Sequence, residues 1–187
     1  IWGRSATDVW AVGAGGAILH YDGRSWVPMI SGTTMSLQGV WGSSATDIWA
    51  VGVGGTIVHY DGHTWSARST GPWGAGSSGT GRSLAGIWGS SASNIFTVGV
   101  GGAIAHFDGG TWTHMVRGTW DHLLGVWGTS ATDVFAVGVA GTIMHYDGRV
   151  WSPMVSGAKT PLQGIWGSPA GDVFAVGEAG TILHPSP

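Results

Sequence analysis

The sequence contains no cysteine and few charged residues of either sign. Without cysteine the chain can form no disulfide, no thiol nucleophile and no cysteine-ligated zinc or iron–sulfur site. Only 9 % of the 187 residues are charged, and the formal net charge is −3. Because proteins that bind nucleic acid or anionic membrane surfaces present a positive patch, this composition argues against nucleic acid as a partner.

Long apolar runs are absent as well. A membrane-spanning helix needs about 20 consecutive apolar residues, and glycine interrupts every apolar run of this chain, as in 134–144. We therefore expect no membrane insertion, and no signal peptide is visible. The 36 glycines also argue against helical repeats, since a glycine inside a helix costs about 1 kcal/mol. With 43 % apolar residues, the chain can form one core of ordinary size, so a single domain over 1–187 is expected.

The sequence is one unit written almost five times. An Ile/Val-Trp-Gly triplet recurs with spacings of 39, 47, 39 and 39 residues, and its tryptophans are Trp2, Trp41, Trp88, Trp127 and Trp166. Three more positions recur in the same register: Gly13, Gly52, Gly99, Gly138 and Gly177; His20, His59, His106, His145 and His184; Trp26, Trp65, Trp112 and Trp151. The longer spacing reflects an eight-residue insertion within 69–83. The units are 1–39, 40–86, 87–125, 126–164 and 165–187, and because the chain begins and ends inside a repeat, we expect it to be a segment of a longer protein.

One unit has the pattern of four short strands separated by glycine-rich turns. In the second unit we expect strands at 37–42, 47–52, 56–60 and from Trp65 onward. Gly54-Gly55 and Asp61-Gly62 have the residue types of tight hairpin turns. Four antiparallel strands in about 40 residues are typical of one blade of a β-propeller.

The sequence therefore predicts an all-β, five-bladed β-propeller with four-stranded blades of about 39 residues. The last blade is incomplete, because only three residues follow His184, whereas 19 residues separate His20 from Val40 in the first unit. Either this blade has three strands, or a neighbouring segment or another chain completes it. The strands are apolar on both faces, so we expect neighbouring blades to cover them and the in-register tryptophans to lie in the core.

The segment 51–65 reads Val-Gly-x-x-Gly-x-Ile-x-His-x-Asp-Gly-x-x-Trp. It resembles the BNR or Asp-box-like propeller repeats of the photosystem II assembly-factor type, and similar repeats are common in secreted bacterial proteins. The resemblance covers all five units, although the fifth ends before its Asp-Gly. It departs from the sialidase Asp-box, Ser-x-Asp-x-Gly-x-x-Trp, in having His in place of Ser and one residue fewer between Asp and Trp. The resemblance implies a propeller fold without sialidase chemistry, in a secreted or cell-surface bacterial protein.

The repeated polar residues fit structural roles. The in-register histidines lie on the expected third strand, two strand spacings of about 4.8 Å from the strand that lines the channel, too far apart to share a metal ion at about 2.1 Å. We expect them to be buried and hydrogen-bonded, and we predict neither a metal nor a cofactor. Carboxylates that recur at the turns fit a repeated turn, whereas catalysis needs a pair in two different environments. These are Asp8, Asp47, Asp133 and Asp172, with Asn94 in the third unit, and Asp22, Asp61, Asp108 and Asp147.

Residues without a counterpart in other units mark the candidate site. Trp73 and Trp120 are the only tryptophans outside the repeat, and both lie in connections between a fourth strand and the next first strand. These connections share one face of a propeller with the second-to-third-strand turns. We predict a ligand platform there, formed by Trp73, Arg82, Trp120, Asp121, His122, Lys159 and Glu178. Exposed rings can stack on a sugar while polar groups orient it; the alternative is a variable loop whose tryptophan folds back over the channel mouth.

We predict no catalytic residues. A glycosidase needs two positioned carboxylates, and the candidates outside the repeat, Asp121 and Glu178, belong to different blades. The first expectation is thus a non-catalytic, lectin-like propeller that binds a glycan or another small ligand. The alternative is a protein–protein platform, in which the same face, or the incomplete last blade, binds a protein partner or a second copy. A glycoside hydrolase is the third hypothesis.

Overall fold

A computed structural model describes residues 1–68, 81–168 and 171–184, which form five antiparallel sheets in chain order. The first sheet contains β1 (Trp2–Ser5), β2 (Asp8–Val12), β3 (Ile18–Tyr21) and β4 (Trp26–Met29). The second contains β5 (Leu37–Ser44), β6 (Asp47–Gly52), β7 (Ile57–Tyr60) and β8 (Trp65–Ala67). The third contains β9 (Leu84–Ser91), β10 (Asn94–Gly99), β11 (Ala103–Phe107) and β12 (Trp112–His114). The fourth contains β13 (Leu123–Ser130), β14 (Asp133–Gly138), β15 (Ile143–Tyr146) and β16 (Trp151–Met154), and the last contains β17 (Leu162–Gly167), β18 (Val173–Gly177) and β19 (Ile182–Leu183).

The helical segments among these residues are single 3₁₀ turns that join the second strand of a sheet to the third. They are η1 (Ala14–Gly16), η2 (Val53–Gly55), η3 (Val139–Gly141) and η4 (Glu178–Gly180). Within the described part of the chain, no helix is long and apolar enough to cross a membrane.

The strands of the second unit lie where the sequence pattern predicts them, at 37–44, 47–52, 57–60 and 65–67. The conformation of the turn residues explains why the strands begin and end at these positions. Gly54 and Gly55 adopt φ angles of 67° and 77°, and Gly62 adopts 92°, in the left-handed region that glycine enters without steric cost. In the last two units alanine takes the place of the first glycine, and Ala140 and Ala179 are held at φ 55°.

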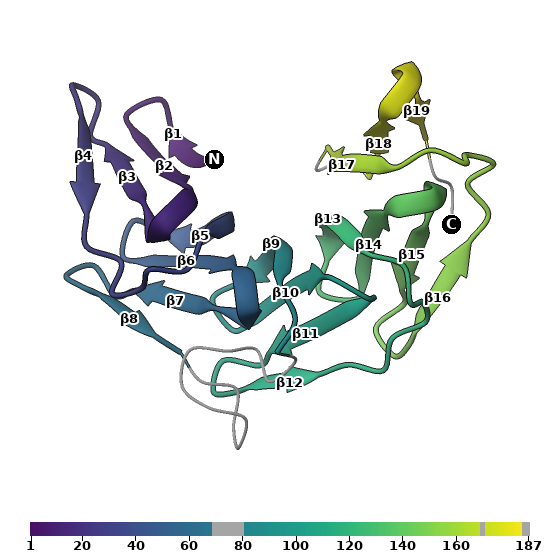
Figure 1. Ribbon diagram of the computed structural model, residues 1–187, viewed down its shortest axis with the longest axis horizontal. Coiled ribbons are helices and arrows are strands. Elements are labelled where there is room, and N and C mark those ends of the chain that lie inside the picture. Colours follow the sequence, from purple (N-terminus) through teal and green to yellow (C-terminus); the bar gives the residue numbers. More distant parts are fainter. Residues whose placement is uncertain (69–80, 169–170, 185–187) are drawn as a thin grey trace.

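The five sheets follow one another around an arc (Figure 1). The first strands of the sheets line its concave side, where each contacts the first strand of the next sheet, and the fourth strands lie on the outside. The first sheet and the last sheet lie apart at the two ends of the arc. The predicted five sheets, and a last sheet with three strands, are therefore present, and the described sheets form an open arc.

The core consists of four apolar clusters, one at each junction between neighbouring sheets. Each of the first three junctions pairs an aromatic ring of a second strand with a tryptophan of the next sheet's fourth strand, edge to face. Ring centroids lie 5.7 Å apart for Trp10–Trp65, 5.7 Å for Trp49–Trp112 and 6.1 Å for Phe96–Trp151. This edge-to-face geometry is the one that aromatic pairs favour.

The Ile/Val-Trp-Gly triplet makes a second contact across each junction. The tryptophan of one triplet lies over the glycine of the next, so a methyl group added to Gly89 would be 2.7 Å from Trp41, and one added to Gly128 would be 2.8 Å from Trp88. The glycine of the triplet is needed because the tryptophan ring of the preceding triplet occupies the space that a side chain would fill.

Two in-register tryptophans are not in the core. Trp26 is 45 % exposed and Trp166 is 61 % exposed, whereas Trp65, at the position equivalent to Trp26, is 8 % exposed. The prediction that all of them are buried is therefore wrong for these two. The equivalent residues Trp65 and Trp41 pack in clusters with a neighbouring sheet, and no such sheet covers Trp26 and Trp166 among the described residues.

Candidate functional site

Each repeated histidine lies against the aspartate of its own unit, or against Asn94 in the third unit. Nε2 of His59 lies 2.6 Å from Oδ1 of Asp47, and Nε2 of His145 lies 2.7 Å from Oδ1 of Asp133. The other three pairs are His20–Asp8 at 2.9 Å, His106–Asn94 at 2.7 Å and His184–Asp172 at 3.7 Å. The expected hydrogen bonds are thus confirmed for four of the five, although the rings are half-buried or exposed rather than fully buried. Across the described residues, no group of three or more His, Cys, Asp or Glu side chains could hold a metal ion.

Hydrogen bonds outweigh burial in setting the pKa of two of these carboxylates, Asp8 and Asp47. Burial alone would raise the pKa of Asp8, but hydrogen bonds from Arg4, His20 and Trp10 outweigh it and lower the pKa. Asp47 follows the same balance, with His59, Ser43 and Trp49 as donors. A carboxylate with a lowered pKa is a poor general acid near neutral pH.

A second set of carboxylates closes the turns between third and fourth strands. Oδ1 of Asp61 accepts hydrogen bonds from the backbone N–H groups of Thr64 and His63, at 2.8 and 2.9 Å. The same bonds lower the pKa of the Asp61 carboxyl. The pattern recurs at Asp22, Asp108 and Asp147. These residues stabilise turns, as predicted from their repetition.

One serine, one aspartate and one histidine of the second sheet come together. The Ser43 hydroxyl and the His59 ring both donate to the Asp47 carboxylate, beside a cavity of about 310 Å³. Because the serine bonds to the carboxylate and not to the imidazole, the ring is not placed to take its proton. The arrangement fits a structural network and not a nucleophile with its base.

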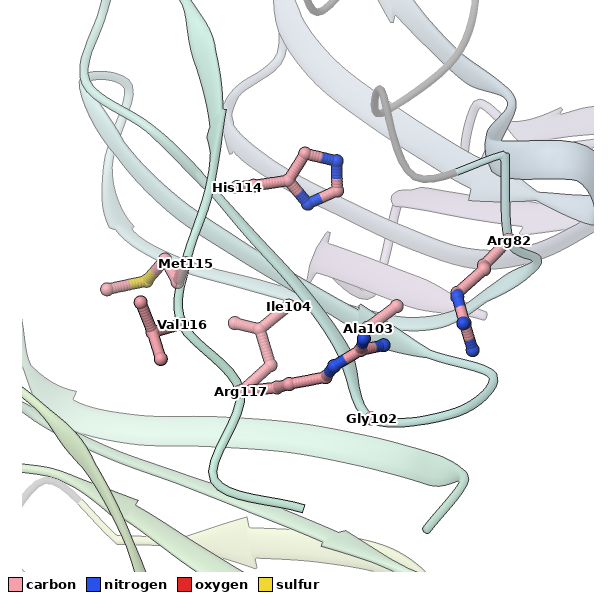
Figure 2. A pocket seen from close by; sticks show the side chains of 8 residues that line it. All are labelled: Arg82, Gly102, Ala103, Ile104, His114, Met115, Val116 and Arg117. Atoms are coloured by element: carbon pink, nitrogen blue, oxygen red, sulfur yellow. The ribbon is translucent and has the colours of Figure 1, made fainter. Parts of the chain in front are cut away.

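A cavity of about 370 Å³ lies in the third sheet (Figure 2). Its lining residues are Arg82, Gly102, Ala103, Ile104, His114, Met115, Val116 and Arg117. Arg82 comes from the connection before β9, Gly102 from the turn between β10 and β11, Ala103 from the start of β11, and Arg117 from the segment after β12. None of the described residues that line the cavity is acidic.

Two guanidinium groups meet in this cavity. Nη1 of Arg117 donates to the carbonyl oxygen of Gly101 at 3.3 Å, and Nη1 of Arg82 lies 3.5 Å from the same oxygen. Figure 2 shows Arg117 reaching across the cavity towards the side of Arg82, with His114 further along the wall. Although the whole chain is acidic, two of its seven Lys and Arg residues converge here.

Trp120 packs on Arg117, one of these two arginines. The guanidinium carbon of Arg117 lies 3.6 Å from the centroid of the Trp120 ring, a cation–π contact. Trp120 is nevertheless 71 % exposed. A ring held by a guanidinium and open to water is preorganised to contact a ligand that also meets the arginines.

Asp121, His122, Lys159 and Glu178, which were also predicted to form the site, do not line this cavity. Asp121 accepts a hydrogen bond from the Thr142 hydroxyl at 2.7 Å, and Glu178 accepts one from the Gln163 amide at 3.3 Å, so the two carboxylates serve different turns. His122 and Lys159 are exposed in connections between sheets. Trp73 lies outside the described residues, so the predicted Trp73–Trp120 pair has no structural counterpart here.

The comparisons with known proteins bear on the fold. No family model matches the chain, and no curated protein matches it. Among solved structures, "YCF48 bound to D1 peptide" aligns with 97 % of this chain at a TM-score of 0.67 and 16 % identity. The structure of YCF48 from Cyanidioschyzon merolae aligns with 95 % of it, also at a TM-score of 0.67, with 18 % identity.

The chain has the fold of a β-propeller. It spans 61 % and 66 % of the length of those two YCF48 chains. The likeness supports the propeller type with which the repeat was compared, although not an Asp-box repeat in particular.

Arg117 and His114 are site residues that the sequence interpretation missed. The position of Arg117, five residues after the fourth-strand tryptophan, is occupied by Ser31 in the first unit and Ser156 in the fourth. An arginine in place of a serine is the same signal that identified Trp120, and it would have identified Arg117 had charged residues been compared across units in the same way.

Proposed function

We propose that this chain is a non-catalytic propeller that binds a protein partner, through an extended segment carrying a carboxylate. The observation that carries the proposal is the convergence of Arg82 and Arg117 on one carbonyl oxygen beside Trp120. Guanidinium groups bind carboxylates through paired, charge-assisted hydrogen bonds. The exposed Trp120 ring would contact an apolar side chain next to that carboxylate.

The outer edge of the third sheet suits an extended ligand. β12 has three residues, is the outermost strand of its sheet, and leads directly into Met115, Val116 and Arg117. A second cavity of about 420 Å³, lined in part by His114 and Arg149, lies against the same segment. Two cavities along one exposed strand edge provide room for a peptide main chain and its alternate side chains.

The comparisons support the protein-binding alternative better than the glycan. One of the similar propellers is described as bound to a D1 peptide, and nothing in the comparisons supports a carbohydrate ligand.

The test is binding of this chain to an array of immobilised 15-residue peptides of graded acidic content. Arg82→Gln together with Arg117→Gln should raise the Kd for bound acidic peptides by roughly tenfold or more, because each lost charged hydrogen bond is worth about 1.5–3 kcal/mol. Binding should also weaken as salt is raised from about 0.05 to 0.5 M. Arg24→Gln, which removes one charge in a turn of the first unit, is the matched control and should leave the Kd unchanged.

Peptide binding that survives the double substitution would contradict the proposed site. If a glycan array gave binding that Trp120→Ala abolishes, while no peptide bound, the lectin hypothesis would replace this proposal.

A further inference from the structure

A cavity of about 310 Å³ lies at the junction of the second and third sheets. Its walls include Asp47, His59, Arg68, Phe107, Gly110 and Trp112. Gly110 belongs to the turn between β11 and β12, at the opposite end of β11 from the turn at which Arg82 and Arg117 meet. The cavity is therefore separate from the proposed peptide site, and a ligand bound in it is independent of the peptide.

Arg68 breaks the repeat at this junction. In three other units the same position, three residues after the fourth-strand tryptophan, is a methionine: Met29, Met115 and Met154. Each methionine packs against the apolar cluster of its own junction. Arg68 is exposed, and the described residues in the cluster of the second and third sheets include no methionine. This junction thus has a guanidinium in place of the apolar side chain that packs at the others.

Two further departures from the repeat border the same cavity. The position of Gly110 carries a long side chain in the units with a third-to-fourth-strand turn other than this one: Arg24, His63 and Arg149. A methyl group built on Gly110 would have its nearest atom at 3.6 Å, so the space beside it is open. Phe107 replaces a tyrosine, whose hydroxyl in Tyr60 donates to the carbonyl oxygen of Gly62. The half-buried Phe107 ring has no such group and provides an apolar wall.

The guanidinium of Arg68 is held by the histidine of the second unit. Its Nη2 lies 2.9 Å from Nδ1 of His59, and Nε2 of the same ring lies 2.6 Å from Oδ1 of Asp47. Because a guanidinium can only donate, Nδ1 accepts this bond and Nε2 is the ring's donor to Asp47. The contact uses one of five N–H groups, so Arg68 can still donate to a ligand.

Trp112 has an indole N–H that is buried without an acceptor. The residue is 3 % exposed, and its Nε1 has no hydrogen-bond partner among the described residues. At the next junction the equivalent Trp151 donates to the sulfur of Met115 at 3.4 Å. Trp65 also lacks a partner, but its junction retains the methionine. Arg68, which stands in the place of Met115, has no acceptor atom, so an acceptor for Trp112 has to come from a ligand.

We propose that this cavity binds a small organic carboxylate with an apolar body. The carboxylate accepts from Arg68, since guanidinium and carboxylate match in charge and geometry. The apolar body lies against Phe107, in the space beside Gly110. A volume of about 310 Å³ is near the lower limit for ligand cavities, so the ligand is a small molecule. A single negative charge is favoured over two because the Asp47 carboxylate lines the same cavity.

The test follows the indole N–H signals of isotope-labelled protein by NMR while benzoate, phenylacetate or cinnamate is added. Each acid is compared with its uncharged amide. At least one acid should shift the Trp112 signal, assigned with Trp112→Phe, in a saturable way with a Kd below about 1 mM. Its amide should bind at least roughly tenfold more weakly, because it lacks the charge that pairs with Arg68.

Two variants restore the residues of other units and should therefore fold. Arg68→Met removes the guanidinium and should weaken binding of the acid by roughly tenfold or more. Gly110→His introduces the side chain of the second unit into the open space and should also weaken it, without backbone strain, because the φ of Gly110 lies outside the left-handed region. Arg24→Gln is the matched control for lost charge. Arg117→Gln, at the peptide site, should bind the acid like the wild type.

If none of the acids shifts the indole signals, the cavity is not a carboxylate site and the proposal is wrong. Binding that Arg68→Met leaves unchanged would overturn it too, and amides that bind as tightly as their acids would replace it with an apolar site. Arg68→Met should bind acidic peptides like the wild type, so failure of this proposal and failure of the peptide site give different results.

Discussion

At the residue scale, the role of a repeated position can be tested by comparing a unit that carries a different residue there with the units that share the common one. Four units hold their histidine with an aspartate, and the third holds His106 with Asn94. Burial lowers the pKa of His106, opposed only in part by the charge of Asp108. An amide can accept the same hydrogen bond but provides no negative charge to favour the imidazolium.

Asn94→Asp should therefore raise the pKa of His106, as measured by NMR titration of the histidine ring signals, with His106→Gln used for assignment. Asn94→Ala is the control, because it removes the hydrogen bond without adding charge, and it should not raise the pKa. An unchanged pKa in Asn94→Asp would show that the carboxylate is not formed beside the ring.

The same pKa predicts a pH dependence of stability. The folded-state pKa of His106 lies below its ordinary value of 6.5, so the unfolded chain binds the proton more readily. The contribution of neutral His106 to stability is complete above pH 6.5 and is lost as the pH falls through the folded-state pKa. Urea titrations at pH 7.5 and pH 5 should show a smaller loss of unfolding free energy for Asn94→Asp than for the wild type.

At the scale of the element, the repeated glycine at the end of each second strand determines how closely the connection between two sheets approaches the sheet that it enters. In four units, a side chain at the repeated glycine would overlap a backbone carbonyl of the connection that enters the sheet, as at Gly99 with the oxygen of Ser83. The N–H of Val100 binds that oxygen at 2.9 Å, which explains why the backbones approach so closely. In the first unit the same position, Gly13, has its nearest atom at 4.0 Å.

Gly99→Ala should consequently destabilise the fold by about 2 kcal/mol or more, because the methyl group would force the connection away. Gly13→Ala is the matched control. Its φ of −167° suits any residue, so the change should be neutral or stabilising by up to about 1 kcal/mol. Chemical denaturation of both variants measures the difference, and equal losses would mean that the overlap at Gly99 is relieved without cost.

The strands and turns could be predicted from the sequence, whereas the site could be predicted only in part. Strand positions follow from short apolar runs separated by glycine-rich turns, which are local signals. Trp120 and Arg82 were found because they break the repeat, but Arg117 and its contacts depend on how the segment after β12 folds back over the turn at Gly101. That contact is between segments 16 residues apart, which no local pattern encodes.

At the scale of the whole molecule, stability comes from the junctions between sheets, because each sheet is apolar on both faces and is covered only by its neighbours. The repeat predicted this sandwiching, and the position of His184 predicted an incomplete last blade, for which three strands were one of the alternatives. It did not predict the open arc, since curvature results from the angle at which sheets pack and no residue count defines that angle.

Equivalent tryptophans should therefore differ in their contribution according to their place in the arc. Trp65→Ala, at a ring 8 % exposed, should cost about 3–5 kcal/mol. Trp26→Ala, at a ring 45 % exposed, should cost less than about half of that in the monomer. Thermal or chemical unfolding at low chain concentration measures both, and equal costs would mean that the first sheet is covered in solution.

The Trp-on-Gly contact has one more consequence, for how such chains change length. Each Ile/Val-Trp-Gly triplet supplies the tryptophan for one junction and the glycine for the other. Every duplicated unit therefore carries both halves of the contact. A gene that gains or loses whole units creates no mismatched junction. The number of sheets is then free to change in evolution while the junction itself stays the same, and the curvature of the arc determines which numbers close.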